Sequence, residues 1–172
     1  MTAVIGMSTG AAWTVDVPTE ADREAIGVGL FAACSAETIR YRFFGMRNHF
    51  PARYLDAVIA GRPDVHDALV ARDDRGDVIA LGSLVTGEQP AELGLLVADA
   101  WQRHRIGSTL FELLLDRARK NGVEWVAASV LAERRHILDL MRTEATPVRT
   151  VLDHGVLEVV YRLHDGIRPE GS

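Results

Sequence analysis

Cysteine is almost absent from this 172-residue chain, which contains Cys34 alone. A single cysteine excludes an internal disulfide and leaves no thiolate cluster for a structural zinc site. The histidines other than His104 are not spaced as metal ligands are; they are His49, His66, His136, His154 and His164. We therefore expect neither a disulfide scaffold nor a metal site.

Long hydrophobic runs and an excess of positive charge are lacking too. No stretch approaches the roughly 20 apolar residues that span a bilayer, and residues 1–10 lack the basic and apolar segments of a secretion signal. The formal net charge of −5 gives no reason to expect nucleic acid as a partner. We expect a cytoplasmic protein without nucleic acid or membrane partners.

Length and composition are those of an ordinary globular protein, with 48% hydrophobic and 25% charged residues. A chain of this length can bury one substantial core but is short for two. We expect a single domain over residues 1–172, with its core at about residues 11–163.

The periodicity of hydrophobic residues predicts an alternation of strands and helices. Their order predicts an α/β (α+β) fold, a central mixed sheet flanked by helices on both faces. The strand over 92–98 is expected to be buried on both faces. The predicted strands are 11–17, 66–72, 78–85, 92–98, 125–131, 148–152 and 156–163, and the predicted helices are 19–34, 36–46, 52–60, 106–120 and 133–142.

The segment of residues 91–110 carries the clearest chemical signal. A strand leads into a short basic loop, and a helix opens at Ile106. The first turn of a helix has unpaired backbone N–H groups that bind anions. Positive charge at residues 103–105 adds to this, and Gly107 permits close approach of a diphosphate. The segment predicts a phosphate-binding loop.

Residues 102–107, with the sequence Gln-Arg-His-Arg-Ile-Gly, resemble the signature Q/R-x-x-G-x-G/A of the GNAT family of acetyltransferases. The segments SAETIRYRFF (35–44), ALVARD (68–73), AELGLLVADAWQ (91–102) and SVLAE (129–133) are similar to the GNAT domain of bacterial protein lysine acetyltransferases. The resemblance covers about residues 11–163 and implies a GNAT-like, largely antiparallel sheet. It further implies direct transfer of an acetyl group from acetyl-CoA to a primary amine, with no covalent enzyme intermediate.

The resemblance also implies roles for particular residues. Glu92 is the candidate general base, because an ammonium group must lose its proton before it attacks; the alternative is a solvated glutamate at a strand end. Backbone groups of Leu95, Leu96 and Val97 would bind the pantetheine arm and polarise the thioester, in addition to packing in the core. The diphosphate would bind to Gln102, Arg103, His104, Arg105, Ile106, Gly107, Ser108 and Thr109; the alternative is a solvated basic loop.

Two departures from the family pattern favour an alternative function. Arg105 stands at the position of the first glycine of the signature. If this position has a positive φ, a residue with a β-carbon is less stable there than glycine by about 1 kcal/mol. The guanidinium of Arg105 is, however, also suited to pairing with phosphates. No tyrosine lies between Tyr54 and Tyr161, so the helix over 133–142 lacks the tyrosine acid of many relatives. The alternative is a degenerate GNAT domain with weak or no CoA binding that acts as a regulatory or interaction module.

Several properties stay open at the level of sequence. The acceptor is either a protein lysine or a small amine, and a homodimer is one alternative for the oligomeric state. Arg40 and Arg42 either shape the acceptor site or form the solvated face of a helix. An unrelated nucleotide-binding protein is disfavoured, because neither GxxxxGK[ST] nor GxGxxG occurs.

Overall fold

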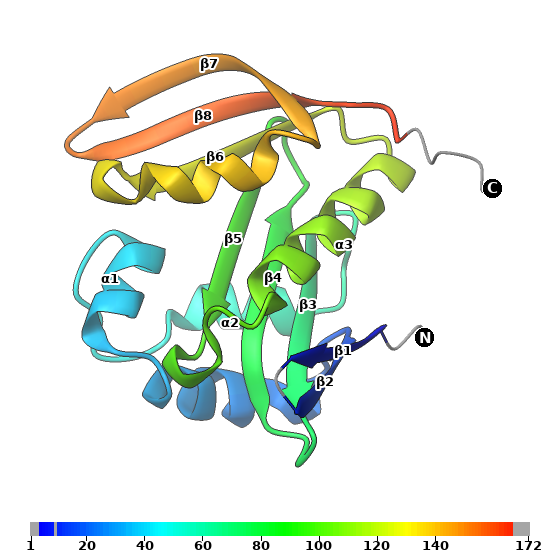
Figure 1. Cartoon of the computed structure of the whole chain (residues 1–172), viewed down its shortest axis with the longest axis vertical. Helices are drawn as coiled ribbons and strands as arrows, with labels where there is room; N and C mark the ends of the chain where they lie inside the picture. Colours follow the sequence, from blue (N-terminus) through cyan, green and yellow to red (C-terminus); the bar gives the residue numbers. More distant parts are fainter. Residues whose placement is uncertain (1–3, 9, 167–172) are drawn as a thin grey trace.

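A computed structural model describes residues 4–8 and 10–166 of the chain. Its strands form one sheet in the order β1-β2-β3-β4-β5-β6-β8-β7 (Figure 1). Within the described residues, β5 and β6 form the one parallel pair, and every other neighbouring pair is antiparallel. The strands are β1 (Val4–Ser8), β2 (Ala11–Asp16), β3 (His66–Asp73), β4 (Val78–Val85), β5 (Ala91–Val97), β6 (Trp125–Leu131), β7 (Ala145–Asp153) and β8 (Val156–Leu163).

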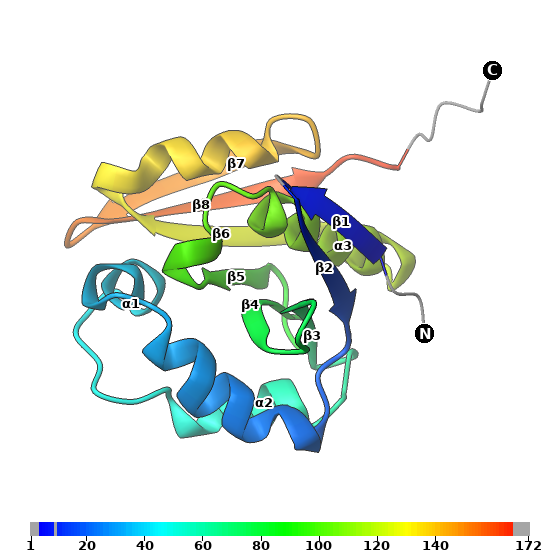
Figure 2. The same ribbon diagram turned by 60° about the horizontal axis from the view of Figure 1, so that its bottom comes forward.

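Helices cover both faces of this sheet (Figure 2). The π-helix η2, α1 and α2 pack on one face, and α3 and η4 pack on the other. The predicted α/β (α+β) fold, a mixed and largely antiparallel sheet between helices, is confirmed. The helical elements are η1 (Glu20–Asp22), η2 (Ala25–Leu30), α1 (Ala36–Phe43), α2 (Ala52–Ile59), η3 (Asp99–Trp101), α3 (Ile106–Lys120) and η4 (Ala132–Met141).

The apolar stripe of α3 builds the larger of the two cores. Apolar side chains that recur at spacings of three and four residues share one face of a helix. On α3 these residues are fully buried against the sheet, while the acidic Glu112 and Asp116 between them are exposed. The buried set is Ile106, Leu110, Phe111, Leu114, Leu115 and Ala118.

Local signals in the sequence set the ends of the helices on the opposite face. The Ser35 hydroxyl accepts a hydrogen bond from the Thr38 N–H at 3.1 Å, which caps α1 as predicted. Pro51 lies at the N-cap of α2, where its missing N–H costs no helical bond. These caps explain why two short helices form here.

Three expectations differ from the structure. Strand β1 was not expected, and it is held by antiparallel pairing with β2. The helical segment predicted over 19–34 contains a 3-10 turn and a π-helix rather than a regular α-helix. Strand β5 is not buried on both faces, since Glu92 is exposed and Leu93 and Leu95 are half-buried. A missing strand neighbour does not explain Glu92 and Leu93, which lie where β5 pairs with both β4 and β6, so it is the helices that leave these side chains incompletely covered.

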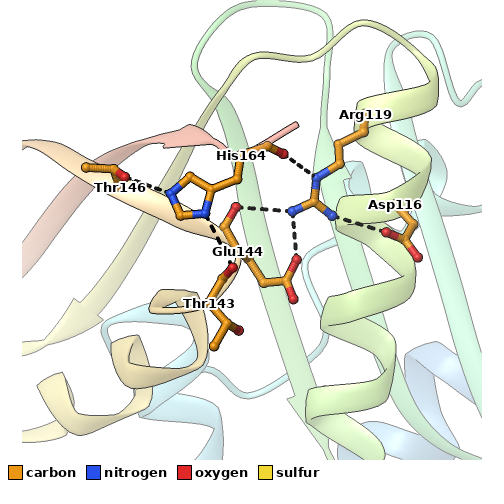
Figure 3. A network of polar contacts seen from close by, with 6 residues as sticks. All are labelled: Asp116, Arg119, Thr143, Glu144, Thr146 and His164. Carbon is orange, nitrogen blue, oxygen red and sulfur yellow. Dashed lines mark hydrogen bonds and ion pairs between the residues drawn. The ribbon is translucent and has the colours of Figure 1, made fainter. Parts of the chain in front are cut away.

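A polar network fastens the end of α3 to the closing hairpin (Figure 3). The Arg119 guanidinium donates to the carbonyl of His164 at 2.9 Å, to the Glu144 carboxylate at 2.7 Å and to the Asp116 carboxylate at 3.1 Å. The His164 ring lies 2.7 Å from the Thr146 hydroxyl. This network fixes β7 and β8 relative to α3. No helix within residues 4–8 and 10–166 is both long and apolar enough to cross a membrane.

Candidate functional site

Strands β5 and β6 separate part-way along their length. Their parallel pairing covers residues Ala91 to Leu93 of β5, although β5 continues to Val97 and stays paired with β4 that far. Figure 1 shows the two strands diverging beyond their paired part. We call the opening between residues 94–97 of β5 and residues 129–131 of β6 the wedge.

Backbone groups of β5 line this wedge. The Ala98 N–H donates to the Ile79 carbonyl on β4 at 2.9 Å, and backbone groups point to alternate sides along a strand. The N–H and C=O of Leu95 and the N–H of Val97 therefore point into the wedge. Leu96 turns its backbone groups toward β4 and its side chain into the core, where it is 2% exposed. Of the three residues predicted to bind pantetheine, Leu95 and Val97 thus offer free backbone groups.

The loop after β5 ends in a run of free N–H groups at the start of α3. Within the described part of the chain, the backbone N–H groups of residues 103–108 donate no hydrogen bond. At Gly107 an added Cβ would meet only the Val97 Cγ2 atom, at 3.6 Å, which is an ordinary contact. No protein group therefore requires a glycine here. Free donors beside open space are what close approach of an anion needs.

Two arginines of this loop have left-handed backbone conformations. Arg103 has φ 66° and Arg105 has φ 63°, so the positive φ considered for Arg105 is present. The Arg105 carbonyl accepts hydrogen bonds from the Ser108 hydroxyl at 3.0 Å and from the Thr109 hydroxyl at 2.8 Å. The Thr109 N–H also donates to this carbonyl, at 3.0 Å. Thr109 therefore stabilises the helix start and has no free donor, while Ser108 keeps its N–H free.

The side chains of Gln102, His104 and Ile106 hold the loop against the rest of the protein. The Gln102 side-chain amide donates to the Val97 carbonyl and to the Thr38 hydroxyl, both at 3.2 Å. A His104 ring nitrogen lies 2.9 Å from the Gln102 carbonyl. The Ile106 side chain is 1% exposed and belongs to the core. These contacts hold the free N–H groups in place.

Cys34 is not an activated nucleophile. Its thiol points toward the Val97 carbonyl, with the Sγ atom 3.8 Å away. Burial raises the pKa of the Cys34 thiol to about 12, and the charge of Asp99 acts in the same direction. The thiol therefore stays protonated at neutral pH.

Glu92 lies on the sheet face that α1 and α2 cover. It is paired with Val85 on β4, and Val85 is paired with His66 on β3, so the three form one row across the sheet. The neighbouring row contains Gly94 and Ser83. Side chains directly opposite each other in a sheet share a face. Glu92, His66 and Ser83 are thus brought to one surface, although 26 residues separate His66 from Glu92 in the sequence.

Helices α1 and α2 add further polar groups to this surface. The Tyr54 hydroxyl is hydrogen-bonded to the Ser83 hydroxyl, and the Tyr54 and His66 rings lie 5.3 Å apart. The guanidinium of Arg42 lies against Gly94. No role was predicted for Tyr54, Ser83 or His66, because their shared position follows from strand register and helix packing.

Ion-pair and aromatic contacts join α1 to η4 near the open end of the wedge. The Arg40 guanidinium lies 2.6 Å from the Glu133 carboxylate. The Arg134 guanidinium lies 4.5 Å from the centre of the Tyr41 ring. Both pairs are partly exposed, so each contributes little to stability. Within residues 4–8 and 10–166, no group of three or more His, Cys, Asp or Glu side chains is arranged to hold a metal ion.

Comparison with known proteins places the chain in a family. The model of the acetyltransferase (GNAT) family matches residues 34–142. The chain belongs to the GNAT family. The matched residues contain the wedge, the loop of residues 98–105 and the surface formed by Glu92, His66 and Ser83. The resemblance inferred from the loop signature is confirmed.

Solved GNAT structures share the fold over nearly the whole chain. The GNAT domain of S. lividans PAT is 25% identical, with 94% of this chain and 96% of that one covered and a TM-score of 0.78. The putative acetyltransferase yncA from Salmonella typhimurium, solved with acetyl-CoA, is 16% identical, with coverages of 93% and 98% and a TM-score of 0.68. Spermidine N-acetyltransferase from Vibrio cholerae, in complex with CoA and spermine, is 14% identical, with coverages of 88% and 95% and a TM-score of 0.66. No curated protein sequence matches this GNAT chain.

Proposed function

We propose that this GNAT protein is an N-acetyltransferase that moves an acetyl group from acetyl-CoA to a primary amine. The observation that carries the proposal is the run of free N–H groups at residues 103–108, directly beside the wedge. The diphosphate would accept hydrogen bonds from these groups, and Arg103 and Arg105 would add positive charge. The pantetheine arm would pair with Leu95 and Val97 as an extra strand-like segment in the wedge.

The reaction consists of direct attack. The amine nitrogen forms a bond to the thioester carbonyl carbon, the C–S bond breaks, and CoA leaves as a thiolate. Before the attack, Glu92 takes one proton from the ammonium group of the acceptor, directly or through one water. The second proton, which the nitrogen loses as the amide forms, passes to the departing thiolate or to solvent. Its exposed position on the α1 and α2 face leaves the carboxylate accessible to an acceptor from solvent. The thiolate of a thiol with a pKa of about 8.5 is a stable enough leaving group to depart without a dedicated acid.

The alternative is a degenerate GNAT domain with weak or no CoA binding that acts as a regulatory or interaction module, and it is favoured by Arg105 and by the missing tyrosine. Arg105 puts a side chain and a left-handed backbone at the signature's first glycine. Binding of acetyl-CoA separates the two proposals, because a ligand that binds only the native state stabilises it. At 100 times its dissociation constant, acetyl-CoA raises the free energy of unfolding by about 2.7 kcal/mol.

The test is thermal unfolding of the whole chain with and without millimolar acetyl-CoA, with pantetheine as the ligand that lacks the diphosphate. The matched variant is Gly107→Asp. A carboxylate in the first turn of α3 stabilises the helix but repels a diphosphate. We expect acetyl-CoA to raise the melting temperature of the wild type and not of the variant. The absence of any shift in the wild type would reject the proposed acetyl transfer.

A further inference from the structure

Arg42 lies on the same face of the sheet as Glu92, packed closely against the backbone of β5. Its guanidinium lies so close to Gly94 that a Cβ at that position would be 2.3 Å from the Arg42 Nη2 atom and 2.7 Å from Cζ. On its other side, the guanidinium carbon lies 4.9 Å from the centres of the Phe43 and Tyr54 rings. The Arg42 guanidinium is thus packed against the backbone of β5 and the rings of Phe43 and Tyr54.

This guanidinium has no anionic partner in the part of the chain that the structure describes. Other arginines nearby do have one: Arg40 on the same helix pairs with Glu133, and Arg72 on β3 pairs with the buried Asp22. The side chain of Arg42 is half-buried, and a partly desolvated cation without a counter-ion is costly. Contact with two aromatic rings offsets part of that cost but uses none of the five N–H donors.

A second polar group beside Arg42 also lacks a partner. His66 is 6% exposed, and its Nε2 atom is buried without a hydrogen bond. Burial lowers the pKa of His66, and the charge of Arg42 lowers it further, so the ring is neutral at neutral pH. The His66 ring contacts Tyr54, as Arg42 does. Unsatisfied buried polar atoms are uncommon in a folded protein, and a bound water or a ligand would satisfy this one.

We propose that Arg42 binds a carboxylate of the acceptor, and that the acceptor is therefore an amine that also carries a carboxylate group. The proposal rests on the proposed acetyl transfer, because it concerns the second substrate of the same site. The planar fork of an arginine matches the two oxygens of a carboxylate. Glu92 lies two residues from Gly94 on the same face of β5, so a carboxylate for the ammonium group and a cation for the acid group are presented on one face of the sheet without pairing with each other.

The same arrangement disfavours a polyamine. A second ammonium group of such an acceptor would meet the charge of Arg42 in a partly desolvated site, where like charges repel strongly. Small amino acids and lysines that neighbour an acidic side chain share the required chemistry, which is an amine and a carboxylate a few ångströms apart. A purely structural Arg42, in contrast, would affect stability and leave the choice of acceptor unchanged.

The experiment compares acceptors in matched pairs. Acetyl transfer is measured for a panel of free amino acids, each paired with its carboxamide, and for lysine peptides with aspartate or asparagine beside the lysine. The ratio of kcat/KM for the acid to kcat/KM for the amide is then compared between wild type, Arg42→Gln and Arg42→Lys, so that intrinsic differences between the amines cancel. Arg53→Gln, an exposed arginine on α2, is the control.

We expect the wild type to prefer the carboxylate and Arg42→Gln to reduce that preference by about 10- to 100-fold, the size of a lost charge-assisted hydrogen bond. Arg42→Lys should retain part of it, and Arg53→Gln all of it. A preference in the amino acid arm identifies a free amino carboxylate, and one in the peptide arm identifies an acidic protein segment. A ratio that Arg42→Gln leaves unchanged overturns the proposal.

Binding to the free protein gives a second measurement that does not depend on catalysis. Ligand-observed NMR of the same amino acids and amides is recorded with wild type and Arg42→Gln in the absence of acetyl-CoA. Carboxylate-selective binding that the variant loses supports the role of Arg42 even if acetyl-CoA does not bind, in which case only the proposed acetyl transfer fails. Absence of selectivity in both rates and binding overturns the role of Arg42.

Discussion

Replacing Arg105 by glycine tests the position where the phosphate loop departs from the GNAT signature. Arg105 has φ 63° and ψ 11°, a left-handed conformation that costs a residue with a β-carbon about 1 kcal/mol or more. The unliganded protein already adopts this conformation. The backbone strain therefore lowers the free energy of unfolding of the unliganded protein. Its removal by itself does not tighten the binding of acetyl-CoA.

The effect of Arg105→Gly on stability is expected to be small. Glycine relieves about 1 kcal/mol of backbone strain, but it also gives the unfolded chain about 0.4–1 kcal/mol of additional conformational freedom. The two terms nearly cancel, so the free energy of unfolding should change by less than about 0.5 kcal/mol. A change in affinity can then be attributed to the side chain.

The effect on affinity is expected to be larger. The Arg105 side chain is exposed and, within the described residues, makes no hydrogen bond or ion pair, so it is free to pair with phosphates. Losing a charge-assisted hydrogen bond weakens acetyl-CoA binding by about 1 to 3 kcal/mol, or roughly 5- to 150-fold. Because the interaction is exposed, the loss should shrink as salt is added.

Calorimetric titration with acetyl-CoA at low and high salt measures this loss for Arg105→Gly and Arg105→Asn. Asparagine tolerates the left-handed conformation but has no charge, so both variants should lose affinity equally if the guanidinium is responsible. A loss in the glycine variant alone would assign the effect to loop flexibility. Tighter binding by Arg105→Gly would refute the phosphate contact and favour the degenerate domain, because it would mean that the side chain crowds the diphosphate.

Two further predictions concern the proposed base and a buried ion pair. Glu92→Gln should leave acetyl-CoA binding intact and lower turnover by about 100-fold or more, the usual size of general-base catalysis; an unchanged rate at limiting acceptor would reject Glu92 as the base. The hydrogen bond from Arg72 holds the pKa of buried Asp22 below its ordinary value of 3.8, against the opposing effect of burial. The Asp22 carboxylate therefore stabilises the fold above that pH, and the stabilisation is lost as the pH falls below it. In urea unfolding, Asp22→Asn should be less stable than wild type by about 1 to 3 kcal/mol near neutral pH. This difference in the free energy of unfolding should become smaller at about pH 3. A difference independent of pH would contradict a stabilising role of the Asp22 carboxylate.

Residues that interact with near neighbours in the chain were predictable. The apolar spacing of α3, the Ser35 cap and the position of the turn at residues 153–155 all follow from contacts within a few residues. The free N–H groups at the start of α3 belong to the same class, because the first turn of any helix leaves its N–H groups without helical partners.

Other features depend on partners that are distant in the sequence. Strand β1 exists because it pairs with β2, and the exposure of Glu92, which is paired on both sides with β4 and β6, depends on how far the helices cover that face of the sheet. The predicted backbone role of Leu96 did not allow for its orientation, since strand register against β4 decides which backbone groups face the wedge. Periodicity within one strand cannot supply that register.

The amino-acid sequence was sufficient to recognise the family, most of the helices and strands and the loop that carries the free N–H groups, because each depends on local pattern and helix geometry. The surface around Glu92, in contrast, depends on contacts between distant parts of the chain. Strand pairing puts Glu92, Ser83 and His66 on one surface, and helix packing lays Arg42 against Gly94. These residues come from four separate elements, and only the energy of burying their apolar neighbours together fixes their arrangement.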